Sequence, residues 1–409
     1  MISAGVAPRV RRLGAGVVYR NSVLVLLGLG VTFPVFLAPG QAVAPRLGDL
    51  ALLAALPLAV IEWRRTGPIG RVASPLGLFL FTATLLVQQI VSQQDLDAGD
   101  AAFWFRWMAG AAVAPAVASL IVRDSSARRL VFAALLIGAV CHLATYGLLT
   151  LIGRDVLEAV GLASPRASAS SVAAHLRLVT LAEHPNAAMA MMGLAAPAAL
   201  LLGERRRAGL FLITTGLCVV TIGFLTTLSR GGMAAAGVAV LSRVVVGWRW
   251  RERARPLAWI LAVCCVATAG MWVQASPADP GLERLSARFD VARLQDNAAD
   301  RLSTWRDAAG RALDQPLGAG WTSASDMGAF RGESVSHNGY LFVARTAGLL
   351  FGLVLLALHL LSAARLDALT PLSVYVLAMM FIEDLAQGGG FVFLICLAAA
   401  LAWRRPVAP

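Results

Sequence analysis

The longest polar interval of the chain, Pro277 to Tyr340, is rich in arginine and contains one histidine. Its arginines are Arg284, Arg288, Arg293, Arg301, Arg306, Arg311 and Arg331. It ends in Ser336-His337-Asn338-Gly339-Tyr340, directly before an apolar run. Guanidinium groups bind anions through paired hydrogen bonds, and a neutral imidazole accepts a proton near neutral pH. The interval is therefore where we expect the chemistry of this protein.

A helix within this interval is expected to present part of the site. Asn297 is a candidate for its N-terminal cap, and Pro316, Gly318 and Gly320 are expected to end it with a turn. Its apolar residues recur at helical spacing and are Leu302, Trp305, Ala309 and Leu313. Before it, Arg284 and Arg288 are one turn apart, so they would share one helical face.

The composition indicates an all-α integral membrane protein. Hydrophobic residues make up 58% of the 409 residues, charged residues only 14%, and the mean hydropathy is +0.73. Apolar runs predict about twelve spans of a hydrocarbon layer about 30 Å thick. These runs are Val23–Ala38, Leu47–Ile61, Val72–Val91, Trp104–Val122, Leu130–Ile152, Ala187–Leu202, Ala208–Leu228, Gly231–Val246, Pro256–Ala275, Gly339–Leu361, Leu369–Leu385 and Gly389–Trp403.

The spans divide the chain into three parts. Residues 1–275 would hold nine spans and an outer loop at 153–186. Residues 276–337 would form a large helical loop between the ninth and tenth spans. Residues 338–409 would hold the last three spans.

Arginines occupy alternate connections between the predicted spans, which sets the orientation. They lie at 9–20, 64–71, 123–129, 205–207 and 243–255, and Arg404 and Arg405 follow the last span. Positive residues are retained on the cytoplasmic side, so these connections and both termini are predicted to be cytoplasmic. Much of the net charge of +12 is then explained by arginines that set the orientation in the membrane and attract anionic lipid head groups. The charge does not indicate nucleic-acid binding.

Two other polar segments face the predicted outer side. Ser229-Arg230-Gly231-Gly232 joins two spans, and its glycines would let Arg230 and the backbone approach a ligand closely. His184-Pro185-Asn186 opens the sixth span, where a polar residue can cap the helix and proline fits the first turn. For this second segment, capping is the simpler interpretation.

The remaining titratable residues support weaker interpretations. Asp95 and Asp97 lie in an acidic loop that could hold a divalent metal, although solvated charges between two helices explain them better, and we predict no metal site. His142 and His359 have no polar companions at nearby helical spacings, so they are interpreted as packed histidines. Glu383 and Asp384, near the outer end of a span, are more notable because carboxylates are costly at membrane depth. These two could pair with an outer arginine.

Several of these segments, in this order, resemble the O-antigen ligase and polymerase superfamily. They are His184-Pro185-Asn186, Leu228-Ser229-Arg230-Gly231-Gly232, Arg301 with Trp305, Pro316-Leu317-Gly318-Ala319-Gly320, and His337-Asn338-Gly339-Tyr340. The resemblance implies a GT-C type glycosyltransferase of the bacterial inner membrane. It would use a glycan linked to undecaprenyl diphosphate, at the periplasmic face, without a metal or cofactor. The ligase branch transfers the glycan to lipid A-core, the polymerase branch extends it, and a further branch glycosylates proteins.

Under this resemblance the site residues take definite roles. His337 would be the general base of an inverting transfer, with Glu333 as its orienting partner or a rival base, and Arg288 and Arg230 would stabilise the departing diphosphate. The residues expected to bind substrate are Arg284, Arg301, Asn338, Tyr340, His184, Asn186 and Glu333. We favour the ligase, with a polymerase or a protein O-oligosaccharyltransferase as the alternative. A lipid-linked glycan flippase stays open as a different class, although its polar groups would have to follow a route through the membrane.

Overall fold

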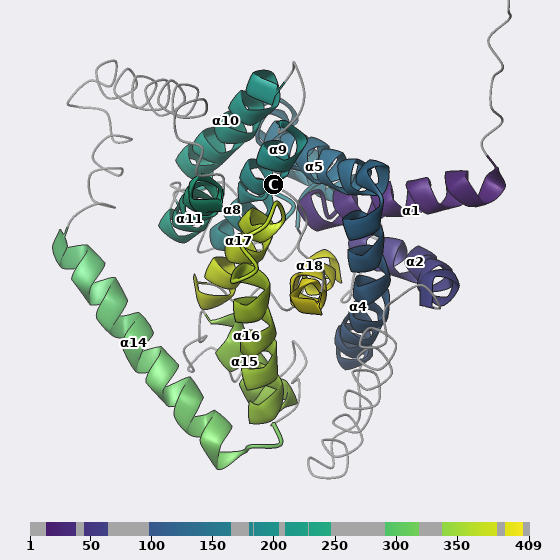
Figure 1. Ribbon diagram of the computed structural model, residues 1–409. Helices are drawn as coiled ribbons and strands as arrows, with labels where there is room; N and C mark the ends of the chain where they lie inside the picture. Colours follow the sequence, from purple (N-terminus) through teal and green to yellow (C-terminus); the bar gives the residue numbers. More distant parts are fainter. Residues whose placement is uncertain are drawn as a thin grey trace, which may run out of the picture.

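The computed structural model describes residues 14–37, 45–63, 98–164, 180–182, 184–203, 209–227, 229–246, 291–318, 338–382 and 389–403. Over these ranges the chain is helical, and the pairing of Phe36 with Arg46 is an isolated β-bridge. The helices (Figure 1) are α1 (Ala15–Thr32), α2 (Leu47–Trp63), α4 (Ala98–Arg123), α5 (Ser125–Ile152), α6 (Arg154–Ala159), α8 (Pro185–Gly193), α9 (Ala195–Gly203), α10 (Gly209–Thr227), α11 (Arg230–Val246), α14 (Val291–Asp314), α15 (Gly339–Ala347), α16 (Leu349–Ala363), α17 (Thr370–Ile382) and α18 (Gly389–Ala400). A short 3₁₀ turn, Leu401–Trp403, follows α18.

Five stretches of the described chain are long and apolar enough to cross a membrane. They are α1, α4 from Ala101, α5, α8 with α9, and α10. Shorter apolar helices include α16, α17 and α18 with its 3₁₀ turn. The all-α, multi-pass class is thereby confirmed, whereas a total of about twelve spans stays a prediction. The expected spans Val72–Val91 and Pro256–Ala275 lie outside the described residues, and the three-part division of the chain also stays a prediction.

Helix α18 lies between α17 and α4, near the centre of the bundle (Figure 1). It is apolar on all sides, and its side chains from Phe391 to Ile395 are almost fully buried, as expected for a helix without a polar face. Glycines bring its neighbours close. A side chain at Gly390 would collide with the backbone of Gly30 in α1, and one at Gly30 would collide with that of Gly48 in α2. Small residues at such crossings are what permits close packing of membrane helices.

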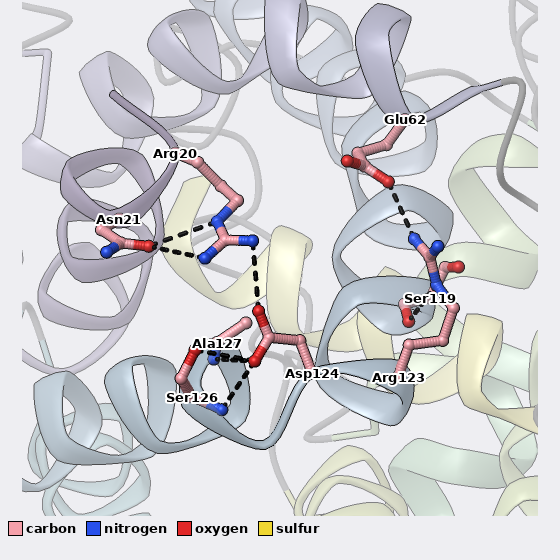
Figure 2. A network of polar contacts seen from close by, with 8 residues as sticks. All are labelled: Arg20, Asn21, Glu62, Ser119, Arg123, Asp124, Ser126 and Ala127. Atoms are coloured by element: carbon pink, nitrogen blue, oxygen red, sulfur yellow. Dashed lines mark hydrogen bonds and ion pairs between the residues drawn. The ribbon is translucent and has the colours of Figure 1, made fainter. Parts of the chain in front are cut away.

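Two ion pairs join the first helices at one end of the bundle (Figure 2). Arg20 of α1 contacts Asp124 at 3.1 Å, and Arg123 of α4 contacts Glu62 of α2 at 2.8 Å. Asp124 also caps α5, and the hydrogen bond from the Ser126 hydroxyl is the main cause of a lowered pKa of this carboxyl group. The beginning of α1, the end of α2, the end of α4 and the beginning of α5 therefore lie together. The alternating arginines predict the same grouping for these connections.

The expected tenth span, Gly339–Leu361, is instead two helices, α15 and α16, packed against each other. The chain turns at Gly348, whose φ of +112° is a conformation that residues with a side chain rarely adopt. A Cβ at Gly352 would lie 2.9 Å from the backbone oxygen of Tyr340. In one continuous helix these residues would be about 18 Å apart. The prediction of a single span was wrong because both helices are apolar, so the turn leaves no mark in the hydropathy.

Helix α14 departs from the sequence prediction at its start. It begins at Val291, so Asn297 lies inside the helix and is not its cap. Leu302 and Leu313 are exposed, whereas the buried residues are Thr304, Ala308 and Ala312. Small residues, which allow close approach, thus form the most buried face of α14, and Trp305 and Ala309 are partly buried.

The expected turn after α14 is present, and it packs against the junction of α15 and α16. Gly318 has a φ of +90°, and the backbone N–H of Leu349, the first residue of α16, donates to the carbonyl oxygen of Pro316 over 2.9 Å. A side chain at Gly318 would overlap with the backbone around Ala347. The end of α14 is therefore fixed against the junction of α15 and α16.

Candidate active site

The last turn of α17 is the point at which three of the predicted segments meet. Arg301 of α14 donates from Nη1 to the carbonyl oxygen of Ile382 over 3.2 Å. Gly231 of α11 lies directly against the Ile382 side chain. The ring of Tyr340 packs on Phe381, with centroids 5.0 Å apart. Three segments from different parts of the chain thus contact two neighbouring residues of one helix.

The two glycines after Arg230 allow α11 to approach its neighbours. A side chain at Gly231 would overlap with Ile382 of α17, and one at Gly232 would overlap with Met189 of α8. We expected these glycines to give a ligand access to the backbone. Their open sides are instead filled by protein, so their role is helix packing. This packing fixes Arg230, a partly exposed residue, at the beginning of α11.

Asn186 ties α8 to the connection between α10 and α11. The hydroxyl of Ser229 donates to the Asn186 side-chain oxygen over 2.8 Å, and both residues are buried. The backbone N–H of Asn186 donates to Nδ1 of His184 over 3.3 Å, and Pro185 is the first residue of the helix. The predicted cap at the start of α8 is confirmed. His184, Asn186 and Arg230 accordingly belong to one connected region of the structure.

Asn338 caps α15 from a buried position. Its side-chain oxygen accepts the backbone N–H groups of Tyr340 over 3.0 Å and Leu341 over 3.1 Å. The Tyr340 hydroxyl lies 2.7 Å from Nδ1 of His359, inside the protein. The first turn of α15 is therefore fixed both by its cap and by a side chain of α16. His337, which precedes this turn in the sequence, lies outside the described residues.

Several other predicted residues also lie outside the described ranges. They are Arg284, Arg288, Glu333, Glu383, Asp384, Asp95 and Asp97. Among the residues that the structure describes, no group of three or more His, Cys, Asp or Glu could hold a metal ion. The described site residues are His184, Asn186, Arg230, Arg301, Asn338 and Tyr340. Helices α8 and α11 contact each other, as do α14 and α15, and α17 joins the two pairs.

The partners of His359 could not be identified from the sequence around it. Its Nε2 lies 2.9 Å from the carbonyl oxygen of Ile395 in α18, and Nδ1 contacts Tyr340 of α15. The interpretation as a packed histidine without polar companions missed both partners, because they come from other helices. One general signal was present: buried ring nitrogens require partners, so a buried histidine must find them elsewhere in the fold.

The fold and these contacts define a multi-pass, all-helical membrane protein with charged and amide side chains collected around the end of α17. Residues 213–357 match the family model described as O-antigen ligase. The match supports membership of the O-antigen ligase and polymerase family, in agreement with the resemblance of the motifs. The family points to a membrane glycosyltransferase-like enzyme with lipid-linked glycan and lipid partners. No curated protein matches the chain.

Proposed function

We propose that this protein is an O-antigen ligase that transfers a glycan from undecaprenyl diphosphate to lipid A-core at the periplasmic face of the bacterial inner membrane. The observation that carries the proposal is that Gly231 (the residue directly after Arg230), Arg301 and the Asn338–Tyr340 turn meet around the end of α17. All of these residues lie inside the segment that matches the O-antigen ligase family. The membrane provides both lipid substrates by lateral diffusion.

Arginines suit the donor in this reaction. When the bond between the anomeric carbon and the diphosphate oxygen breaks, the electron pair and negative charge remain on undecaprenyl diphosphate. Guanidinium groups placed beforehand in a partly dry site stabilise that charge more strongly in the transition state than in the ground state. We assign this role to Arg288 and Arg230, supported by Arg284 and Arg301. No step in this scheme requires a metal.

The acceptor needs a base. Its hydroxyl oxygen attacks the anomeric carbon from the side opposite the diphosphate, which inverts the configuration, and its proton passes to neutral His337. Nearby arginines favour the neutral imidazole because a second positive charge beside them is costly. Asn338, buried and capping α15, would restrict the backbone next to His337. Glu333 is assigned as its orienting partner, while His184 and Asn186 would border the substrate.

Reconstitution of the purified protein tests the proposal. Proteoliposomes receive labelled undecaprenyl-diphosphate glycan with lipid A-core, with a second donor glycan, or with an acceptor protein. Labelled lipid A-core, formed without an energy source, is the expected product. A lengthened glycan on the donor lipid would indicate the polymerase, and a labelled protein would indicate the protein-glycosylating branch. Movement of the donor across the bilayer without any product would indicate a flippase and contradict the proposal.

A further inference from the structure

His359 is a fully buried residue of α16 that connects two other helices. Gly352 and His359 are seven residues apart, so they lie on the same side of α16. At Gly352 this side approaches the backbone of Tyr340 and Ala344 in α15. At His359 it meets the Tyr340 hydroxyl over 2.7 Å and the Ile395 carbonyl oxygen over 2.9 Å. Tyr340 thus extends along α16 and ends on the imidazole.

The two contacts determine the direction of the hydrogen bonds. A carbonyl oxygen can only accept, so Nε2 of His359 carries the proton and donates to Ile395. In the neutral ring this leaves Nδ1 as an acceptor, and the Tyr340 hydroxyl donates to it. The result is a chain of two hydrogen bonds from α15 through α16 to α18. Along this chain the Tyr340 hydroxyl donates to His359, and His359 donates to the Ile395 carbonyl oxygen.

Tyr340 lies in the first turn of α15, so its hydrogen bond to His359 also restricts the position of that turn. Its backbone N–H binds the Asn338 side chain, its ring packs on Phe381, and its hydroxyl is held by His359. With these three attachments the residue has little freedom to rotate or shift. Asn338, whose side chain accepts the backbone N–H of Tyr340, is held in place by the same attachments.

We propose that His359 is a positioning residue for the proposed transfer reaction, acting through Tyr340 on the turn that carries Asn338 and follows His337. Tyr340 then has a supporting role, because its hydroxyl is directed into the helix packing. The inference rests on the proposed function, since it assigns a role within that same site.

A matched control comes from a second buried histidine. His142 of α5 donates from Nδ1 to the Thr32 carbonyl oxygen over 3.0 Å and stacks on Tyr146. It is as buried as His359 and also bonds to a backbone carbonyl. These partners of His142 lie in α1 and α5, away from the turn at Asn338. Replacement of His142 therefore measures the cost of losing a buried histidine as such.

The experiment compares Tyr340→Phe, His359→Phe, His359→Gln and the double Phe variant with His142→Phe, all as full-length purified protein in proteoliposomes. Turnover, the KM for the donor and the thermal unfolding midpoint are measured for each. Tyr340→Phe removes a single oxygen, so it keeps the fold testable even if His359→Phe is poorly folded.

Tyr340→Phe and His359→Phe are each expected to lower kcat about 10–100-fold, the size of effect that a small misplacement produces, with little change in the donor KM. The double variant should fall no further than either single variant, because both remove the same connection. His359→Gln, which keeps a donor and an acceptor, should recover part of kcat. His142→Phe should lower the unfolding midpoint while kcat per folded molecule is maintained.

Unchanged kcat in the folded Tyr340→Phe protein overturns the inference. It is also overturned if kcat follows only the folded fraction and His142→Phe behaves in the same way, since that is the result of a structural role. Absence of product from the wild-type protein overturns the proposed function and the inference with it. An active wild type with active Tyr340→Phe and His359→Phe variants refutes the inference alone.

Discussion

The hydroxyl of Ser229 donates a hydrogen bond to the side-chain oxygen of Asn186 over 2.8 Å, although 43 residues separate them in the sequence. Both residues are buried. The bond joins the start of α8 to the loop that precedes Arg230. It therefore connects two segments whose motifs have no visible relation in the sequence.

Ser229→Ala should destabilise the protein, because it removes a hydrogen bond between two buried side chains. A hydrogen bond of this kind contributes about 0.5–1.5 kcal/mol. Asn186→Ala should cost a similar amount, and the double variant should cost less than the sum of the two. Thermal unfolding of the four proteins in one detergent measures this. Additive effects would mean that the two side chains do not interact.

Gly231→Ala should disturb the site through packing. Its new methyl group would overlap with the Ile382 side chain, and overpacking of this kind costs about 1–3 kcal/mol. Turnover should fall as α11 and α17 separate. The control is Gly237→Ala in the same helix, where no atom lies within 4 Å of the new Cβ. That change should stabilise the protein by about 0.5–1 kcal/mol, and equal effects of the two changes would refute the packing role.

The class of the protein and the order of its motifs were predictable because they depend on local chemistry. Apolar runs give spans, and cap residues such as His184 and Asn338 act within one turn of the helices they begin. The turn at Gly348 was missed since the apolar run is continuous through it. The most buried residues of α14 were not predicted since they are small, Ala308 and Ala312 among them. Contacts between distant helices were not predictable, because a single sequence does not state which helices are neighbours.

Arg301→Ala should release α14 from the end of α17. The guanidinium donates to the Ile382 carbonyl oxygen, and a hydrogen bond from a charged group contributes about 1.5–3 kcal/mol. Faster amide hydrogen exchange in α14 and lower turnover are the expected results. Arg306→Ala, on an exposed position of the same helix, is the matched control. Equal exchange in both variants would show that the Ile382 contact does not hold α14.

Arg288→Lys should impair transfer almost as strongly as Arg288→Ala. If Arg288 binds the diphosphate through two parallel hydrogen bonds, lysine keeps the charge but loses the planar fork. Arg306→Lys should be tolerated. Turnover in the presence of EDTA should stay normal, because arginines stabilise the leaving group. Full activity of Arg288→Ala would exclude the residue, and loss of activity in EDTA that a divalent cation restores would direct attention to Asp95 and Asp97.

His337→Ala should lower kcat by about 10²–10⁴-fold, the usual contribution of a general base, while binding of the donor and insertion into the membrane are retained. The base must be neutral, so wild-type turnover should rise with pH through the pKa of His337 and then level off. The remaining activity of His337→Ala should lack this rise. His175→Ala, which removes one of the two histidines of the predicted outer loop at 153–186, should keep both the turnover and the pH profile. Near-normal turnover of purified His337→Ala would remove this residue from the mechanism, and Glu333→Gln would then be the next variant to test as the base.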